Sequence, residues 1–389
     1  MSEFVVWFDS SETGAPVLNN AAGSLIGVLT ACLVTGFNTK SITSITVAAG
    51  VATATCAGHG YSSVFGKDLL IEGVTNFTEL NGRKALTFVD TTTFRFATTA
   101  PNGTATGTIT AKRDPLGWVR QFTGTNKVIY KRSDVTATSL MLRVDDTNAG
   151  VASATDARAR MVETATDIDT VTGLSPTELQ LSGGQFWNKG TNSTTAKAWR
   201  LFGDGKRFYF FTQVANTGAA AGHGFGDFYS LKPADGYNCL ISGATTAYVG
   251  TGSPTPPIGQ LPGFVAGTNA GVVARPFNQV GSGVPISFAG FTVTATGLST
   301  GALPGYPSPI DSGLLLNPQI VISEDVGGSN FCGRGLHSGI CQVLAKAPFT
   351  DMQVFDPIIS LPGRKLVAVS VSISSGFGQL AIDVTGPWL

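Results

Sequence analysis

The chain contains three histidines, His59, His223 and His337, and this small number limits the acid–base and metal chemistry open to it. His59 and His223 each lie between two glycines, within Gly58–Gly60 and Gly222–Gly224. A histidine in that setting is more often a turn residue that tolerates unusual backbone angles than a catalytic group. We therefore predict a structural turn at both positions.

The spacing closest to that of a metal site belongs to Cys332, His337 and Cys341, with Glu324 and Asp325 nearby. A structural zinc site needs four nitrogen or sulfur ligands, usually in closely spaced pairs, and the chain has no C-x-x-C motif. The other three of the five cysteines stand alone in apolar or turn contexts. We predict reduced, buried thiols, no metal site and no cofactor.

Two facing carboxylates could hydrolyse a glycan. Asp145 and Asp146 are adjacent, but neighbouring residues on a strand point to opposite faces. Five further aspartates lie scattered in turn contexts, where the side chain usually caps its own backbone: Asp156, Asp167, Asp169, Asp204 and Asp227. The glycines of 222–226 resemble a phosphate loop but precede a strand-like run instead of a helix. We predict no catalytic residues and no enzyme activity.

Aromatic residues are concentrated between positions 187 and 211 and have two interpretations. They could form a platform on which a sugar stacks, or they could pack inside a sheet, and the second interpretation is favoured. The residues are Trp187, Trp199, Phe202, Phe208, Tyr209, Phe210 and Phe211.

The composition excludes several classes of protein. The 389 residues include 25 Lys+Arg and 25 Asp+Glu, so the formal net charge is zero, and a basic surface for nucleic acid is missing. The start of the chain lacks the pattern of a secretory signal. The longest apolar stretch, residues 21–37, is interrupted by polar residues and glycines and falls short of the roughly 20 residues of a membrane span. We expect a soluble protein made and assembled in a cytoplasm.

Only 13% of the residues are charged, about half of the usual fraction. Few charges and no net charge favour association between molecules, and the cores of protein interfaces are also depleted in charge. Composition alone leaves two interpretations open. The chain is either a β protein with an uncharged surface or a subunit that buries much of its surface in an assembly.

The positions of glycine, proline and apolar residues predict a mainly β fold with several sandwich-like or barrel-like domains. One short helix is expected around residues 25–33, capped by Asn20 or Ser24 and ended by Gly36. The clearest hairpin joins residues 199–202 to 206–211 through Asp204-Gly205. Runs at 127–131 and 140–144 should be neighbours in one sheet, whereas the glycines of 217–224 predict a loop.

These elements suggest four segments. Residues 1–40 hold a strand and the helix and should pack on later domains, and residues 41–112 form a small β unit of short strands. Residues 113–250 form a second, sandwich-like domain. Residues 251–389 form a β-rich region that begins with a Pro-rich linker at 251–258, and a second Pro-rich stretch occupies 304–309.

Three stretches are similar to virion proteins of tailed bacteriophages. The first comprises residues 9–18, 21–25 and 31–37, and the third comprises 361–365 and 382–388; both resemble one group of phage structural proteins. The second resembles a small β domain that recurs in phage tail and appendage proteins, through 51–60, 70–73, 80–82 and 93–96. The resemblance implies a virion structural protein of the tail, baseplate or neck, and it carries over no catalytic residues.

The sequence therefore predicts a non-enzymatic subunit of a phage particle. Its expected partners are copies of itself and other virion proteins, with no nucleic acid and no membrane span. One alternative is an appendage protein that binds or cleaves a host-surface glycan. A second alternative is a capsid decoration or collar protein.

Overall fold

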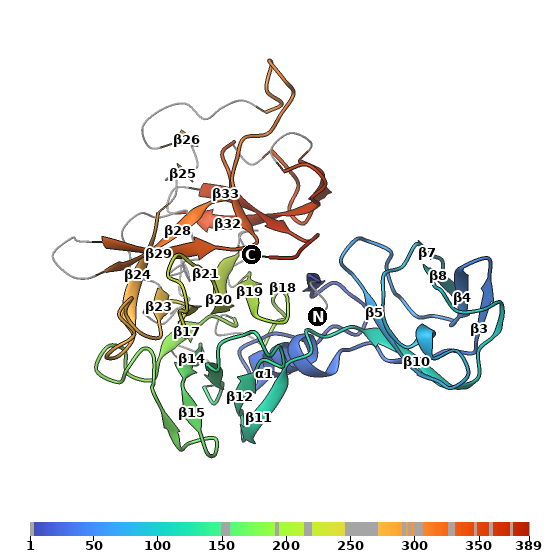
Figure 1. Cartoon of the computed structure of the whole chain (residues 1–389), viewed down its shortest axis with the longest axis horizontal. Helices are drawn as coiled ribbons and strands as arrows, with labels where there is room; N and C mark the ends of the chain where they lie inside the picture. The colour runs from blue at the N-terminus through green and yellow to red at the C-terminus, as the bar shows by residue number, and fades with distance from the viewer. Residues whose placement is uncertain are drawn as a thin grey trace.

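The computed structural model describes most of the chain and is mainly β, as predicted (Figure 1). The described residues are 4–148, 156–190, 194–213, 220–245, 271–289, 293–294, 297–298, 306–325, 331–345, 348–357, 361–373 and 376–388. The linker predicted at 251–258 lies outside them. The second Pro-rich stretch is described only from Tyr306 onward.

The predicted N-terminal helix is confirmed as α1 (Ser24–Thr30), which continues as a π-helical turn, η1 (Ala31–Thr35). It ends at Gly36, whose φ of 72° suits a glycine. The predicted cap is wrong, because Gly23 occupies the N-cap position and no side chain there makes a capping bond. Asp146, far away in the sequence, accepts hydrogen bonds from the first helical amides instead. No helix in the described ranges is long and apolar enough to cross a membrane.

A ten-stranded antiparallel sheet forms the centre of the molecule. In spatial order its strands are β1 (Val6–Asp9), β18 (Trp199–Gly203), β19 (Arg207–Thr212), β20 (Ala221–Asp227), β22 (Cys239–Ser242), β23 (Gly271–Val273), β24 (Val284–Ala289), β28 (Ile320–Asp325), β29 (Phe331–His337) and β21 (Tyr229–Ser230). The predicted hairpin is confirmed as β18 and β19. Because strands from both sides of residue 250 belong to this sheet, the boundary expected there falls within one continuous structure.

The loop predicted at 217–224 is wrong from residue 221 onward, because β20 crosses the middle of the sheet. The cross-strand register explains how a glycine-rich segment fits there. Gly222 lies opposite Phe211 and Gly224 lies opposite Tyr209, so glycines leave room for two large rings on the same face. This packing outweighs the low intrinsic preference of glycine for strands.

Two further layers cover the faces of the central sheet. One is β11 (Val119–Gly124), β12 (Lys127–Lys131), β13 (Met141–Asp145), β14 (Ala157–Val162) and β17 (Gln185–Trp187), with the hairpin β15 (Thr164–Ala165) and β16 (Val171–Thr172) beside it. The other is β27 (Leu316–Asn317), β30 (Ile340–Val343), β33 (Gly376–Asp383), β32 (Leu366–Ile373) and β31 (Val354–Phe355). The short hairpin of β25 (Val293–Thr294) and β26 (Gly297–Leu298) forms a two-stranded sheet of its own. The predicted pairing of 127–131 with 140–144 is confirmed as β12 with β13.

Each layer shares an apolar core with one face of the central sheet. The first core joins alternate residues of β18 and β19, such as Leu201 and Phe208, to α1 and to the β11–β17 layer. In the second core, the intervening residues of β18 and β19, such as Phe202 and Tyr209, pack against β32 and β33. The period of two along each strand therefore divides the aromatic residues between two layers.

The segment predicted as a separate β unit, residues 41–112, forms a small two-sheet unit at one side of the molecule (Figure 1). Its four-stranded sheet is β2 (Lys40–Ser41), β10 (Gly107–Arg113), β5 (Leu69–Val74) and β6 (Gly82–Lys84), with the 3-10 turn η2 (Thr78–Leu80). Its five-stranded sheet is β7 (Phe88–Val89), β8 (Thr93–Ala97), β4 (Val51–Thr55), β3 (Ser44–Ala48) and β9 (Gly103–Thr104). The two sheets enclose a core of their own.

The N-terminal strand holds the small unit against the body. Trp7 lies in β1, pairs with Phe202 of β18, and also donates its backbone N–H to Gly66 O and its Nε1–H to Phe65 O. Beyond the strand, Glu12 forms ion pairs with Lys67 (3.1 Å) and Arg113 (2.6 Å), both of the small unit. One short N-terminal segment thus contacts both parts.

Candidate binding site

The three histidines are buried at three separate places. His59 follows a glycine with positive φ, and its Nδ1 accepts the backbone N–H of Tyr61 at 3.0 Å, which fits the predicted turn. His223 lies within β20, so the turn predicted there is wrong. Its Nε2 accepts the backbone N–H of Asn188 at 3.1 Å, and its ring stacks on Trp187.

His337 does not join the two cysteines of the metal-like spacing. Its Nδ1 lies 3.0 Å from the hydroxyl oxygen of Tyr209, at the end of β29. Cys341 is buried on β30, whereas Cys332 is exposed, so the prediction of buried thiols is wrong for Cys332 alone among the five. Within the described part of the chain, no three histidine, cysteine, aspartate or glutamate side chains gather closely enough to hold a metal ion.

Asp145 and Asp146 point to opposite faces at the end of β13, as predicted. Asp145 is half-buried on the outer face near Lys127, whereas Asp146 is fully buried and pairs with Lys189. The scattered aspartates have structural partners as well. Asp204 and Asp167 accept backbone N–H groups in turns, Asp169 pairs with Lys127 and Arg143, Asp227 pairs with Arg132, and Asp156 is buried.

The aromatic residues between positions 187 and 211 belong to the core, which agrees with the interpretation that they pack inside a sheet. None of the seven is more than 3% exposed. The sugar-stacking platform is therefore wrong for these residues, because no ring face among them is open to a ligand.

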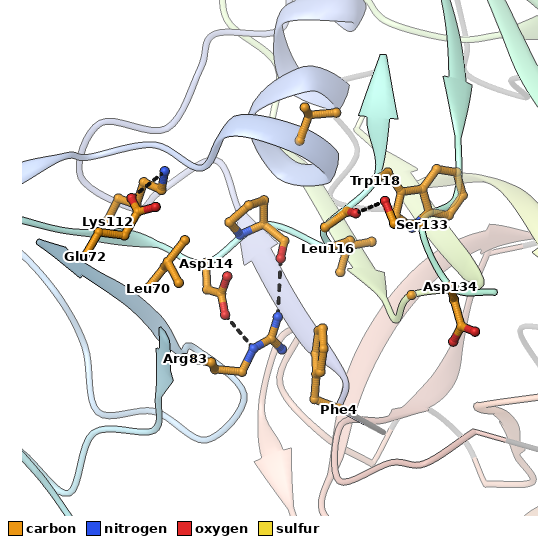
Figure 2. Close-up of a pocket in the computed structure, with 14 residues that line it drawn as sticks. Phe4, Leu70, Glu72, Arg83, Lys112, Asp114, Leu116, Trp118, Ser133 and Asp134 are labelled. Atoms are coloured by element: carbon orange, nitrogen blue, oxygen red, sulfur yellow. Dashed lines mark hydrogen bonds and ion pairs between the residues drawn. The ribbon is translucent and has the colours of Figure 1, made fainter. Parts of the chain in front are cut away.

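A cavity of about 600 Å³ lies where the small unit meets the body (Figure 2). Its size falls in the usual range for small-molecule sites. The small unit contributes residues of β5, β6 and β10, and the body contributes the segments around Leu116, Ser133 and Gly205. The lining residues are Phe4, Val34, Leu70, Glu72, Arg83, Lys112, Asp114, Pro115, Leu116, Gly117, Trp118, Ser133, Asp134 and Gly205.

Ion pairs occupy most of the charged groups of this cavity. Arg83 contacts Asp114 through its Nε and donates from Nη2 to Pro115 O at 3.3 Å, and Lys112 pairs with Glu72 at 3.0 Å (Figure 2). The phenyl ring of Phe4 packs on the guanidinium of Arg83. Asp134 has no ion-pair partner within the described ranges, but one of its carboxylate oxygens accepts the N–H of Thr136 at 2.8 Å.

Burial dominates the electrostatics of the Arg83–Asp114 pair. It raises the pKa of the Asp114 carboxyl to about 6, although Arg83 favours the charged form. It also lowers the pKa of the Arg83 guanidinium to about 10. Both pKa values thus move against the charged forms, which means that the loss of solvation outweighs the attraction between the two groups.

We expect the pair to tolerate joint replacement better than the loss of one member. Arg83→Met or Asp114→Leu alone should lower the free energy of unfolding by about 2–3 kcal/mol, since each leaves one charged group poorly solvated. The variant Arg83→Met/Asp114→Leu should lie within about 1 kcal/mol of the parent. Urea denaturation of the four proteins measures this, and a double variant as unstable as the sum of the singles would contradict it.

The cavity could not be identified from the sequence. Arg83 and Asp114 are 31 positions apart, and neither belongs to a recognisable motif. Four of the five charged lining residues form the pairs Arg83–Asp114 and Lys112–Glu72. The apolar lining residues, such as Leu70 and Trp118, give a neutral wall. The arrangement can hold an uncharged or amphipathic group. Ser133 supplies the one hydroxyl among the lining residues, and this hydroxyl donates to Gly117 O at 2.6 Å.

Comparisons of the chain with protein-family models and with curated proteins find no match.

Proposed function

We propose that this protein is a non-enzymatic structural subunit of a tailed-bacteriophage particle, which docks to copies of itself and to other virion proteins. The proposal rests on the resemblance of both ends and of residues 51–96 to phage virion proteins. We place it in the tail, baseplate or neck, and a capsid decoration or collar position is the alternative.

The observation that best supports a docking role is the burial of charge. The described residues bury nine basic side chains: Lys67, Arg113, Arg132, Arg160, Lys189, Lys197, Arg200, Arg207 and Arg334. Such side chains are rarely buried unless they are paired. Arg334, for example, is fully buried between Glu324 (2.5 Å) and Asp235 (2.9 Å). In a chain with only 25 Lys+Arg, this leaves a surface even poorer in charge than the composition indicates.

A surface poor in Lys and Glu is suited to being covered by neighbouring molecules. Interface cores are depleted in these residues, and low surface charge reduces the repulsion that keeps monomers apart. The glycan alternative loses its main support, because the aromatic residues on which it was based are in the core.

The decisive experiment is mass spectrometry of phage particles purified by density gradient. We expect peptides of this chain to follow the major capsid protein through the gradient at a constant ratio. An unrelated host protein of similar abundance serves as the control and should be lost. If the chain remains with soluble proteins while particles assemble normally, the proposal is wrong.

A second experiment addresses the glycan alternative. The purified protein is applied to an array of bacterial surface glycans, and we expect no binding above that of a heat-unfolded sample. Specific binding of one glycan class would favour the appendage alternative over a purely structural role.

A further inference from the structure

The five-stranded sheet of the small unit has one face that no other part of the described chain covers. Along β3, β4 and β8, alternate residues such as Ile45, Ala52 and Phe94 point into the core of the unit. The residues between them are exposed or half-buried. We call these outward residues the threonine face: Ser44, Thr46, Ala48, Val51, Thr53, Thr55, Phe88, Thr93, Arg95, Ala97 and Thr104.

The strand register orders this face into rows. The central row crosses all five strands and consists of Thr104, Thr46, Thr53, Arg95 and Phe88, each directly opposite the next. A row of serine and threonine lies on one side of it and a row of alanine and valine lies on the other. Cross-strand partners share a face of the sheet, so these side chains form one continuous surface.

Arg95 is the only charged residue of the threonine face, and it has no ion-pair partner among the described residues. Its guanidinium lies over the ring of Phe88, 4.8 Å from the centroid, and Phe88 is 40% exposed. An arginine beside an aromatic ring, surrounded by small uncharged residues, is the composition typical of the energetic centre of a protein interface. The short β-branched side chains around it have few rotamers and lose little entropy on binding.

We propose that the threonine face docks onto a flat protein surface that is uncharged except for one aspartate or glutamate opposite Arg95. This inference rests on the proposed function and names the surface through which the subunit contacts its neighbour. The unpaired charge requires a carboxylate on the partner, because a buried guanidinium without one is costly. Figure 1 places β3 and β4 at the end of the unit away from the body, where a neighbouring molecule can reach them.

A protein fits this face better than a glycan does. Sugar recognition relies on a concave site and on several planar polar side chains, and the threonine face offers only Arg95 of that kind. The ring of Phe88 is also partly covered by the guanidinium, which reduces the area on which a sugar could stack.

The test uses the full chain in cells that produce particles. The photocrosslinking residue p-benzoylphenylalanine replaces Phe88, and in a control protein it replaces Val135, which is 88% exposed on the body. We expect position 88 to crosslink to one peptide of a particle protein that contains an aspartate or glutamate. Arg95→Glu should reduce the yield about tenfold or more, Arg95→Lys should reduce it less, and reversing the partner's carboxylate to arginine should restore it.

The matched control for the charge reversal is Arg120→Glu, which makes the same change on the exposed strand β11 of the body and should leave the yield unchanged. The thermal unfolding midpoint should be the same in all these variants, since both arginines are exposed. The docking inference is overturned if position 88 gives no protein crosslink, gives only glycan or lipid adducts, or keeps its yield with Arg95→Glu. A charge-dependent crosslink to a protein outside the particle would support the docking face and contradict the virion role.

Discussion

Asp146→Ala is expected to lower the free energy of unfolding by about 3–5 kcal/mol, because it removes one member of a fully buried ion pair. The Asp146 carboxylate and the Lys189 ammonium are both completely buried and in direct contact. The same carboxylate accepts the backbone N–H groups of Leu25 at 2.8 Å and Ile26 at 3.3 Å, at the start of α1. Its loss therefore leaves a buried ammonium unpaired and the first amides of the helix unsatisfied.

Chemical denaturation followed by far-UV circular dichroism measures this effect. The neighbouring Asp145→Ala is the matched control, since Asp145 is only half-buried and should cost less than about 1 kcal/mol. Lys189→Met should also be strongly destabilising, because Lys189 donates to Ala21 O and Asn148 O, both at 2.8 Å. The prediction is contradicted if Asp145→Ala and Asp146→Ala lower the free energy of unfolding by the same small amount.

Acid is expected to destabilise the fold through two buried histidines. Burial lowers the pKa of His223 to about 3 and that of His337 to about 3, against about 6.5 in an unfolded chain. Among the described residues, His223 Nδ1 and His337 Nε2 have no hydrogen-bond partner, which agrees with neutral rings. Between pH 6.5 and 3 the unfolded state binds more protons than the folded state. Stability is therefore complete above pH 6.5 and falls as the pH decreases, by roughly 4–5 kcal/mol for each histidine at most.

The measurement is the free energy of unfolding as a function of pH for the parent and for His223→Gln/His337→Gln. The raised pKa of Asp114 has the opposite effect between pH 4 and 6, but it is present in both proteins and cancels in the comparison. We expect the variant to lose less stability on acidification than the parent does. Parallel pH profiles for the two proteins would show that these histidines do not cause the acid sensitivity.

Local patterns were sufficient to predict the parts of the fold that depend on neighbouring residues. Asp204-Gly205 between two aromatic runs predicted the hairpin of β18 and β19, and the apolar spacing after Ser24 predicted α1. The wrong predictions concern segments whose conformation depends on contacts with residues that are distant in the sequence. β20 is a strand because its glycines lie opposite Tyr209 and Phe211, and that register is not visible in a segment taken alone.

The candidate sites were missed for the same reason. The sequence places Asp146 beside Asp145 as a candidate carboxylate pair, whereas its partners in the structure, Leu25 and Lys189, are 121 and 43 positions away. The cavity combines Arg83 with Trp118, and the threonine face depends on the register of five strands. In the sequence, Ile45, Val47, Ala52 and Ala54 alternate with residues that are more exposed in the structure. The sequence does not show which strands are neighbours in the sheet.

The position of β1 also sets an order of events during synthesis. The described strands of the small unit pair only with one another, so the unit can fold once the chain up to Arg113 has emerged from the ribosome. Its anchor, Trp7, becomes part of a sheet only when Phe202 is available, almost 200 residues away in the chain. Contacts of such long range form slowly. We expect the small unit to fold early, while its position relative to the rest of the chain is still variable. Its orientation becomes fixed only after β18 has been synthesised and has paired with β1. A fixed orientation of the small unit therefore indicates that the central sheet has begun to form.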